Sequence, residues 1–233
     1  MSAPAPTRRT TRELEARQAA FRDSLSPAKQ RLFAQWIKAL TASNLAQSAL
    51  AIGDTVPDFI LPSASGQPTR LYSLLERGPV VLVFYRGGWC PYCSTYLTGL
   101  QRELFYIREL GAELIAISPQ LPDASLHVET HHELTFPVLS DVGLKTAHHF
   151  GLVYDLPRNL LRTYREFGID LTAYNGTSHG TQLPLAATYL IGSDRQVLRA
   201  AIDEDPAQRL DPIDILETLP RLRPGFHQPF LPV

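Results

Sequence analysis

Apolar residues near the start of the chain recur every three or four positions, which is the spacing of an amphipathic helix. A helix is predicted over Ser26–Leu40, whose apolar positions are Leu32, Phe33, Trp36, Ile37 and Leu40. It opens on Ser26-Pro27, an N-cap residue followed by a proline at the first helical position. The capping-box pattern Thr-Thr-Arg-Glu at 10–13 predicts an earlier helix that runs to about Asp23. Residues 1–50 are therefore expected to form a polar tail and two helices.

From Ile52 onward the apolar residues gather in short continuous runs. Residues 79–85 form such a run, rich in valine, which predicts a central parallel strand buried on both faces. A helix is predicted to follow and to end at Gly111, because the next apolar residues are spaced 4-3-4-3. These residues are Cys93, Leu97, Leu100, Leu104 and Ile107. A second buried strand is predicted over 113–118.

The second half of the pattern ends in a hairpin. A helix over 122–133 and a short extended segment at 136–139 are followed by two strands at 187–191 and 197–202, joined by a polar turn. A last helix is predicted over 212–219. Since strands alternate with helices and the final hairpin must be antiparallel, the expected fold class is α/β with a mixed central sheet flanked by helices.

The main domain is assigned to residues 51–219, with an insertion at about 155–183 that shows no clear hydrophobic period. Residues 220–233 contain four prolines between apolar residues, and this composition predicts an extended C-terminal arm.

Charge and composition exclude several classes of protein. Lys and Arg total 22 against 23 Asp and Glu, a formal net charge of −1 with no footprint for nucleic acid or an anionic membrane. The densest apolar run, at 80–85, is far shorter than the roughly 18 residues of a membrane span. The first thirty residues lack the apolar segment of a signal peptide, so a cytoplasmic location is expected.

Both cysteines lie in the pentapeptide Trp89-Cys90-Pro91-Tyr92-Cys93. Cys90 follows a predicted strand and Pro91 opens a predicted helix, so the first sulfur stands at a helix N-terminus that should lower its pKa. A spacing of three residues puts Cys93 one turn along the same face. We therefore expect Cys90, as the more exposed thiol, to attack and the more buried Cys93 to resolve the product.

The cysteine pair also allows interpretations other than a redox site. A structural disulfide is disfavoured because it would close too small a loop to constrain the chain. Zinc requires four ligands, and the chain has no second cysteine pair; His127 and His131 stand at i, i+4 but lack the His-Glu-x-x-His pattern. No metal or other cofactor is expected, while a chance pair of inert cysteines stays open.

Neighbouring residues provide candidates for the rest of the site. Arg86 is the one cation close to Cys90 in sequence, and it is expected to stabilise a thiolate or orient a peroxide oxygen. Trp89 and Pro91 are expected to cover the sulfur and to contact the substrate. Gly87 and Gly88 should let the chain turn from strand to helix, and their N–H groups are candidate ligands for a peroxide oxygen.

This arrangement resembles the thioredoxin fold, and more narrowly the peroxiredoxin-like branch of the alkyl hydroperoxide reductase and thiol-specific antioxidant family. The resemblance covers about residues 45–219 and rests on stretches at 53–59, 84–93, 116–120 and 136–141, of which the decapeptide Phe-Tyr-Arg-Gly-Gly-Trp-Cys-Pro-Tyr-Cys is the most specific. It implies a thiol oxidoreductase that reduces hydroperoxides or disulfides through a cysteine and is reduced again by a thioredoxin-like electron donor. The strand that faces the motif would then add Thr188 to the substrate-binding residues.

The chain departs from the family's pattern at two places. Residues 186–188 offer neither the cis-proline of thioredoxins nor the arginine of peroxiredoxins, and the nearest proline is Pro184. Where a typical peroxiredoxin has Pro-x-x-x-Thr-x-x-Cys, this chain has Val83 at the proline position and Gly87 at the threonine position. A thiol-disulfide reductase without significant peroxidase activity is therefore the main alternative. A copper-binding thioredoxin-fold protein is a less favoured one.

The two ends of the chain also suggest self-association. The apolar face of the Ser26–Leu40 helix and the arm residues Leu222, Phe226, Phe230, Leu231 and Val233 together exceed what a monomer usually exposes. A homodimer is predicted, in which at least one of these segments crosses to the other subunit. In the alternative, both segments fold back on their own domain.

Overall fold

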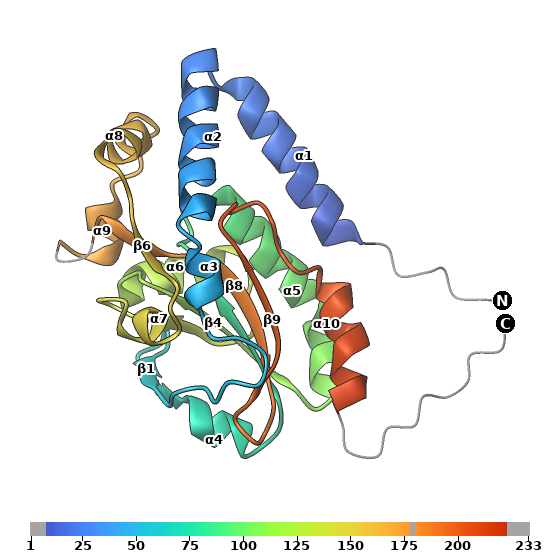
Figure 1. Ribbon diagram of the computed structural model, residues 1–233. Coiled ribbons are helices and arrows are strands. Elements are labelled where there is room, and N and C mark those ends of the chain that lie inside the picture. The colour runs from blue at the N-terminus through green and yellow to red at the C-terminus, as the bar shows by residue number, and fades with distance from the viewer. Residues whose placement is uncertain (1–7, 178–179, 223–233) are drawn as a thin grey trace, which may run out of the picture.

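A five-stranded mixed sheet forms the centre of the computed structural model, which describes residues 8–177 and 180–222 (Figure 1). The strand order is β5-β4-β3-β8-β9, with β3, β4 and β5 parallel and β8 and β9 antiparallel to their neighbours. The strands are β3 (Val80–Phe84), β4 (Glu113–Ser118), β5 (Val138–Ser140), β8 (Ala186–Ile191) and β9 (Val197–Asp203). The predicted α/β class and the antiparallel final hairpin are confirmed.

Alternate residues of β3 enter two different cores, as the period of two in a strand requires. Val81 and Val83 face the helix α5 (Pro91–Glu109), whose buried face includes Leu97 and Leu100. The other face of the sheet packs against α2 (Pro27–Ala42), α7 (Lys145–His149) and α8 (Arg158–Glu166). Because every residue of β3 is buried, the loop that follows it emerges from the middle of the molecule and carries Cys90.

The N-terminal helices α1 (Arg9–Ser24) and α2 (Pro27–Ala42) form a hairpin beside the sheet domain (Figure 1). Helix α1 lies on α5, where Thr10 fits over Gly99: a Cβ on that glycine would lie 2.4 Å from the Thr10 hydroxyl oxygen. The side chain of Ser26 caps α2 as predicted, since it accepts a hydrogen bond from the Lys29 N–H.

The predicted capping box at the start of α1 does not form. The helix begins at Arg9, so Thr10 lies inside it, and its N-terminus is capped from elsewhere. The N–H and hydroxyl of Thr11 both donate to one oxygen of Asp211, at 3.0 and 2.7 Å. The other oxygen of Asp211 caps α10 (Pro212–Thr218) by accepting from the Ile213 N–H.

The apolar face of α2 packs on its own subunit. Trp36 and Leu40 are buried in the main core, and Leu32, Phe33 and Ile37 lie against it half-buried. A crossing of α2 to a second subunit is therefore not needed to cover this face. The C-terminal arm at 223–233 lies outside the described residues, and the stretch Leu219–Leu222 just before it forms a 3₁₀ helix, η1.

The insertion is ordered into helices that the sequence pattern did not predict. It contains α8 (Arg158–Glu166) and α9 (Leu171–Asn175), and its ends pair as the small sheet β6–β7. Helix α8 is too short for a clear period, but Leu160, Thr163 and Tyr164 form its buried face. The remaining elements are α3 (Leu45–Ser48), β1 (Ile60–Pro62), β2 (Pro68–Arg70), α4 (Leu71–Leu75), α6 (Pro122–His131), α7 (Lys145–His149), β6 (Val153–Asp155) and β7 (Gln182–Pro184).

Within the described ranges, no helix is both long and apolar enough to cross a lipid bilayer.

Candidate active site

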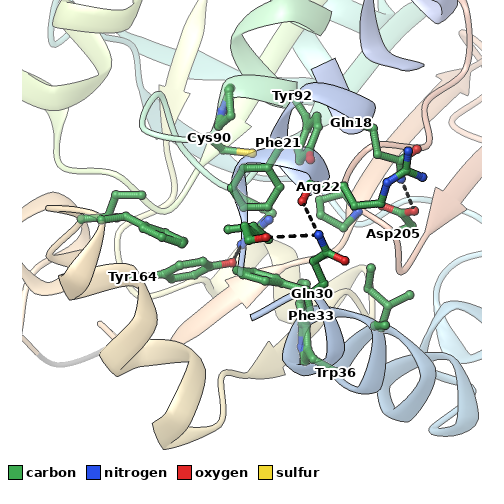
Figure 2. Close-up of a pocket in the computed structure, with 18 of the residues that line it drawn as sticks. Gln18, Phe21, Arg22, Gln30, Phe33, Trp36, Cys90, Tyr92, Tyr164 and Asp205 are labelled. Atoms are coloured by element: carbon green, nitrogen blue, oxygen red, sulfur yellow. Dashed lines mark hydrogen bonds between the residues drawn. The ribbon is translucent and has the colours of Figure 1, made fainter. Parts of the chain in front are cut away.

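Cys90 is the N-cap residue of α5 and lies at the wall of a cavity of about 340 Å³ (Figure 2). The two cysteines are free thiols, and each is 1% exposed. The expectation that Cys90 would be the more exposed sulfur is therefore wrong, because the N-terminal helices and the insertion cover it. The two thiols differ in what they face: Cys90 lines this cavity, and Cys93 does not.

Aromatic rings from separate parts of the chain line most of the cavity. They come from α1, α2, the Cys90 loop with the start of α5, and the insertion, so the walls exist only once these segments have come together. The rings are those of Phe21, Phe33, Trp36, Trp89, Tyr92, Tyr164 and Phe167. At the rim, Gln18 donates to Asp205 at 2.9 Å and ties α1 to the loop after β9 (Figure 2). The result is an apolar cavity with the Cys90 sulfur at one end.

Arg86 is the buried charged group of this cavity, which Arg22 and Asp205 also line, and is only 3% exposed. Its guanidinium lies over the rings of Trp36 and Trp89, with the guanidinium carbon 5.6 and 4.9 Å from the ring centres, and it donates a hydrogen bond to the Tyr164 hydroxyl. Among the described residues it has no carboxylate partner, and its Nε has no hydrogen-bond acceptor. A buried guanidinium without a counter-ion strongly favours an anion next to it, and the nearest candidate in the chain is a thiolate.

The geometry at Gly87 explains the missing threonine. Gly87 has a φ of +142°, and a Cβ there would lie 2.4 Å from the indole nitrogen of Trp89. A threonine at this position would require a strained backbone and a displaced Trp89. The place that holds a hydroxyl in the family motif is therefore filled by an indole ring in this chain.

The sequence made the backbone N–H of Gly88 a candidate donor to a peroxide oxygen. In the structure this N–H already has an acceptor. The Gly88 N–H donates to the side-chain oxygen of Gln120 at 2.7 Å. Gln120 is buried and comes from the loop after β4, so it fixes the turn that leads to Cys90. This contact makes the Gly88 turn part of the scaffold of the site.

Arg209, which the sequence analysis missed, faces the other cysteine. It lies in the loop after β9, and its guanidinium approaches the Cys93 sulfur at 3.6 Å. No local motif marks it, because 116 residues separate Arg209 from Cys93. Only the return of the chain past the start of α5 brings the two together.

The two thiols share one proton in this arrangement. Burial and the hydrogen bond to Cys93 raise the pKa of the Cys90 thiol. Burial would also raise the pKa of Cys93, but the hydrogen bond from Cys90 and the nearby guanidinium groups of Arg209 and Arg86 outweigh it and lower that pKa to about 5. The pair therefore favours one negative charge stabilised by the guanidinium groups of Arg86 and Arg209, and burial opposes the lowered pKa expected for Cys90 at the helix N-terminus.

The structure brings most of the predicted site residues together. Cys90, Arg86, Trp89 and Pro91 all line the one cavity. Thr188 does not: it is buried on β8 opposite Val83, its hydroxyl bonds to that of Tyr96 at 3.0 Å, and it faces a separate hollow beside Arg209.

Residues 52–200 match the model of the AhpC/TSA family. The chain belongs to this family. A putative peroxiredoxin of Mycobacterium tuberculosis is 30% identical over 146 residues, which is 63% of this chain and 81% of the relative. The crystal structure of peroxidoxin BcpB from the same organism has a TM-score of 0.59 at 27% identity, covering 75% of this chain and 99% of that one. A thiol-disulfide oxidoreductase, ResA of Geobacillus thermodenitrificans, is 33% identical over 125 residues, 49% of this chain and 65% of the relative.

The thioredoxin-like fold and the peroxiredoxin-like family predicted from the cysteine motif are thereby confirmed. The protein is an enzyme with the chemistry of a thiol peroxidase. The family match starts at residue 52, so it leaves out α1 and α2, which provide much of the cavity wall. In the part of the chain that the structure describes, no group of three His, Cys, Asp or Glu side chains is placed to hold a metal ion.

Proposed function

We propose that this protein reduces apolar organic hydroperoxides, with Cys90 as the attacking thiol and Cys93 as the resolving one. The observation that carries the proposal is the common placement of Cys90 and the counter-ion-free Arg86 in one aromatic cavity. Peroxide cleavage needs a sulfur nucleophile and positive charge near the developing oxyanion, and these two residues provide both.

The shared proton gives a balanced first step. As the Cys90 sulfur attacks the terminal oxygen of the hydroperoxide, its proton passes to the Cys93 thiolate. The oxygen–oxygen bond breaks, Cys90 becomes a sulfenic acid, and the departing alkoxide takes the proton from Cys93 and leaves as an alcohol. Cys93 is then a thiolate again, as the next step requires.

The second step closes the disulfide. The Cys93 thiolate attacks the Cys90 sulfur and displaces hydroxide, which takes up a proton to form water. The two sulfurs stand one turn apart at the start of α5, close enough for a hydrogen bond between them. A thioredoxin-like dithiol then supplies two electrons and two protons and is itself oxidised to a disulfide.

The cavity supports an organic substrate over hydrogen peroxide. Its volume of about 340 Å³ is roughly ten times the share of liquid volume taken by one water molecule, and hydrogen peroxide is only slightly larger than water. Aromatic walls bind an apolar group through desolvation and gain little from a small polar molecule. Cumene hydroperoxide, with one aromatic ring and one hydroperoxide group, is a suitable probe.

The test compares three reactions of the full-length protein: consumption of cumene hydroperoxide, of hydrogen peroxide, and reduction of insulin disulfides, the first two with thioredoxin and its reductase. We expect the highest kcat/KM for cumene hydroperoxide. The Cys90→Ser variant should reduce this substrate no faster than background. Peroxide rates at the level of free cysteine would contradict the proposal.

A thiol-disulfide reductase is the second candidate function. It is favoured by the Cys-x-x-Cys spacing and by the similarity to ResA. Insulin reduction that is fast while both peroxides react at background rates would establish it. The aromatic lining of the cavity is the observation against it, since such walls suit a small apolar substrate better than the polar backbone around a protein disulfide.

The homodimer remains a prediction and now depends on the C-terminal arm, because α2 covers its apolar face on its own subunit. The adjacent rings of Phe105 and Tyr106 on α5, 65% and 56% exposed, offer a second apolar surface for such contact. Light scattering on the full chain and on a chain ending at Leu219 tests this. A monomer mass for the full chain at micromolar concentration would exclude the dimer. The cytoplasmic location is likewise kept as a prediction.

A further inference from the structure

Peroxide cleavage needs a hydrogen-bond donor at the oxygens as well as a nucleophile, because negative charge develops on the departing oxygen. We propose that the hydroxyl of Tyr164 is this donor, a catalytic residue supplied by the insertion helix α8. The inference rests on the proposed function and adds a group that touches the substrate. Four observations carry it.

The first observation is the position of Tyr164. Its side chain lines the same cavity as Cys90 and Arg86, and Figure 2 shows its hydroxyl end directed inward toward the space that the Cys90 sulfur also faces. Its ring packs against that of Trp89 with the centres 5.4 Å apart. Tyr164 therefore approaches the sulfur past the same indole that fills the space beside Gly87.

The second observation is the direction of its hydrogen bond to Arg86. A guanidinium has only donors, so the phenol oxygen must accept that bond, and the phenol's own proton points elsewhere. This leaves Tyr164 with one O–H to donate into the cavity. A hydroperoxide oxygen bound there would be its acceptor.

The third observation is that the phenol keeps its proton. Tyr164 is 5% exposed, and burial raises its pKa above the usual value even though Arg86 acts in the opposite direction. At neutral pH the side chain is a neutral donor and does not neutralise Arg86. The guanidinium and the phenol together then offer two donors to the substrate oxygens, the unpartnered Arg86 Nε and the Tyr164 O–H.

The fourth observation concerns the alternatives near the sulfur. The Ser94 hydroxyl donates a hydrogen bond to the Gly88 carbonyl. The Thr188 hydroxyl is hydrogen-bonded to that of Tyr96 and lies outside the cavity lining. The hydroxyl of Tyr92 is the other one in the cavity lining; it lies on α5 and, unlike that of Tyr164, accepts no hydrogen bond from Arg86. Tyr164 is thus the residue whose hydroxyl lines the cavity and is hydrogen-bonded to a charged group, Arg86.

The test separates donation to oxygen from reactivity of the sulfur. Tyr164→Phe should lower kcat/KM for cumene hydroperoxide by about 10- to 100-fold, the range expected for the loss of one preorganised donor. The rate of Cys90 alkylation by iodoacetamide should stay within about twofold, because iodide leaves without a proton. Tyr154→Phe is the matched control: Tyr154 is buried near Arg86 on β6 but does not line the cavity.

Each outcome decides between interpretations. An unchanged peroxide rate in Tyr164→Phe overturns the inference, and so does an equal loss of peroxide and alkylation rates, which would mark a structural role. A wild-type protein that reduces insulin but not peroxides overturns the proposed function and this inference with it. Should Tyr164→Phe not fold, 3-fluorotyrosine at position 164, a stronger donor, should raise the peroxide rate without changing alkylation; no change would overturn the inference.

Discussion

The two sulfurs of the Cys-x-x-Cys motif face different surroundings although only one helical turn separates them. On the Cys90 side, aromatic rings line a cavity whose buried cation, Arg86, has no described carboxylate partner. On the Cys93 side, the half-buried Arg209 reaches the sulfur from a loop and borders a more polar hollow with Asp203 and Asp214.

In the mechanism we propose, this difference gives the two sides separate tasks. The Cys90 side binds and polarises an apolar substrate, because ring surface and a buried cation act together there. The Cys93 side takes the proton during attack. On this proposal the two similar residues of a short motif act as nucleophile and base because of what long-range folding places beside each.

The strongest test of this division is to remove each sulfur in turn. Cys90→Ser should lose more than about 1,000-fold in peroxide reduction, since the remaining thiol, Cys93, does not line the cavity. Cys93→Ser should react once, more slowly because the base that takes the Cys90 proton is gone, and then accumulate a sulfenic acid on Cys90, detectable by dimedone labelling and mass spectrometry. A sulfenic acid found on Cys93 in Cys90→Ser would mean that the two roles are reversed.

Arg86→Met tests the cation of the enclosed side. Methionine keeps an unbranched apolar stem among the aromatic rings but removes the guanidinium and its charge. The rate of peroxide reduction should fall by about 10-fold or more, through lost stabilisation of the anionic sulfur and oxygen. Stopped-flow kinetics with a thermal unfolding control measure this, and an unchanged rate in a folded variant would reduce Arg86 to a structural residue.

The Cys93 side is tested by the pH dependence of peroxide reduction in the Arg209→Met variant. In the wild type the peroxide rate should fall as the pH drops through about 5, because Cys93 then takes a proton and can no longer accept the one from Cys90. Without the cation, the thiolate is less stable, so its pKa rises and the midpoint should move up by about one unit. The thiolate absorbance near 240 nm should shift in parallel. A midpoint that stays in place would show that Arg209 does not hold this charge.

The smallest expected effect concerns the wall contributed by α2. Phe33→Ala should raise KM for cumene hydroperoxide by about 5-fold and leave the kinetics with hydrogen peroxide unchanged, because only the larger substrate reaches that ring. Phe105→Ala, the same substitution at an exposed ring on α5, is the control. Equal changes for both peroxides would remove the cavity as the determinant of specificity.

The sequence predicted the sheet domain well and the surroundings of the site poorly. Residues 80–84 and 113–118 could be assigned because fully buried strands show as uninterrupted apolar runs. The motif at 89–93 could be interpreted because a strand, a Cys-Pro pair and a helix have local signals. Tyr164 and Arg209 have none: one lies on a nine-residue helix, the other on a loop, and both reach the site through contacts across dozens of residues.

The prediction of an exposed Cys90 with a lowered pKa failed because of similar long-range contacts. A helix N-terminus lowers a thiol pKa when the sulfur is near water, and the sequence pattern could not show that α1, α2 and the insertion would cover it. Burial then became the dominant influence on Cys90. The Gly87 position likewise shows as a missing threonine in sequence and as an occupied space in three dimensions.

The carboxylate of Asp211 links the order of synthesis to the assembly of the site. Helix α1 precedes the sheet domain in the sequence, but the group that caps its N-terminus lies 200 residues later in the chain. An isolated helix of 16 residues is only marginally stable in water, and a missing N-cap costs it about 1 kcal/mol. Helix α1, which forms part of the cavity wall over Cys90, therefore receives its N-cap only after every strand of the sheet and both cysteines have been synthesised.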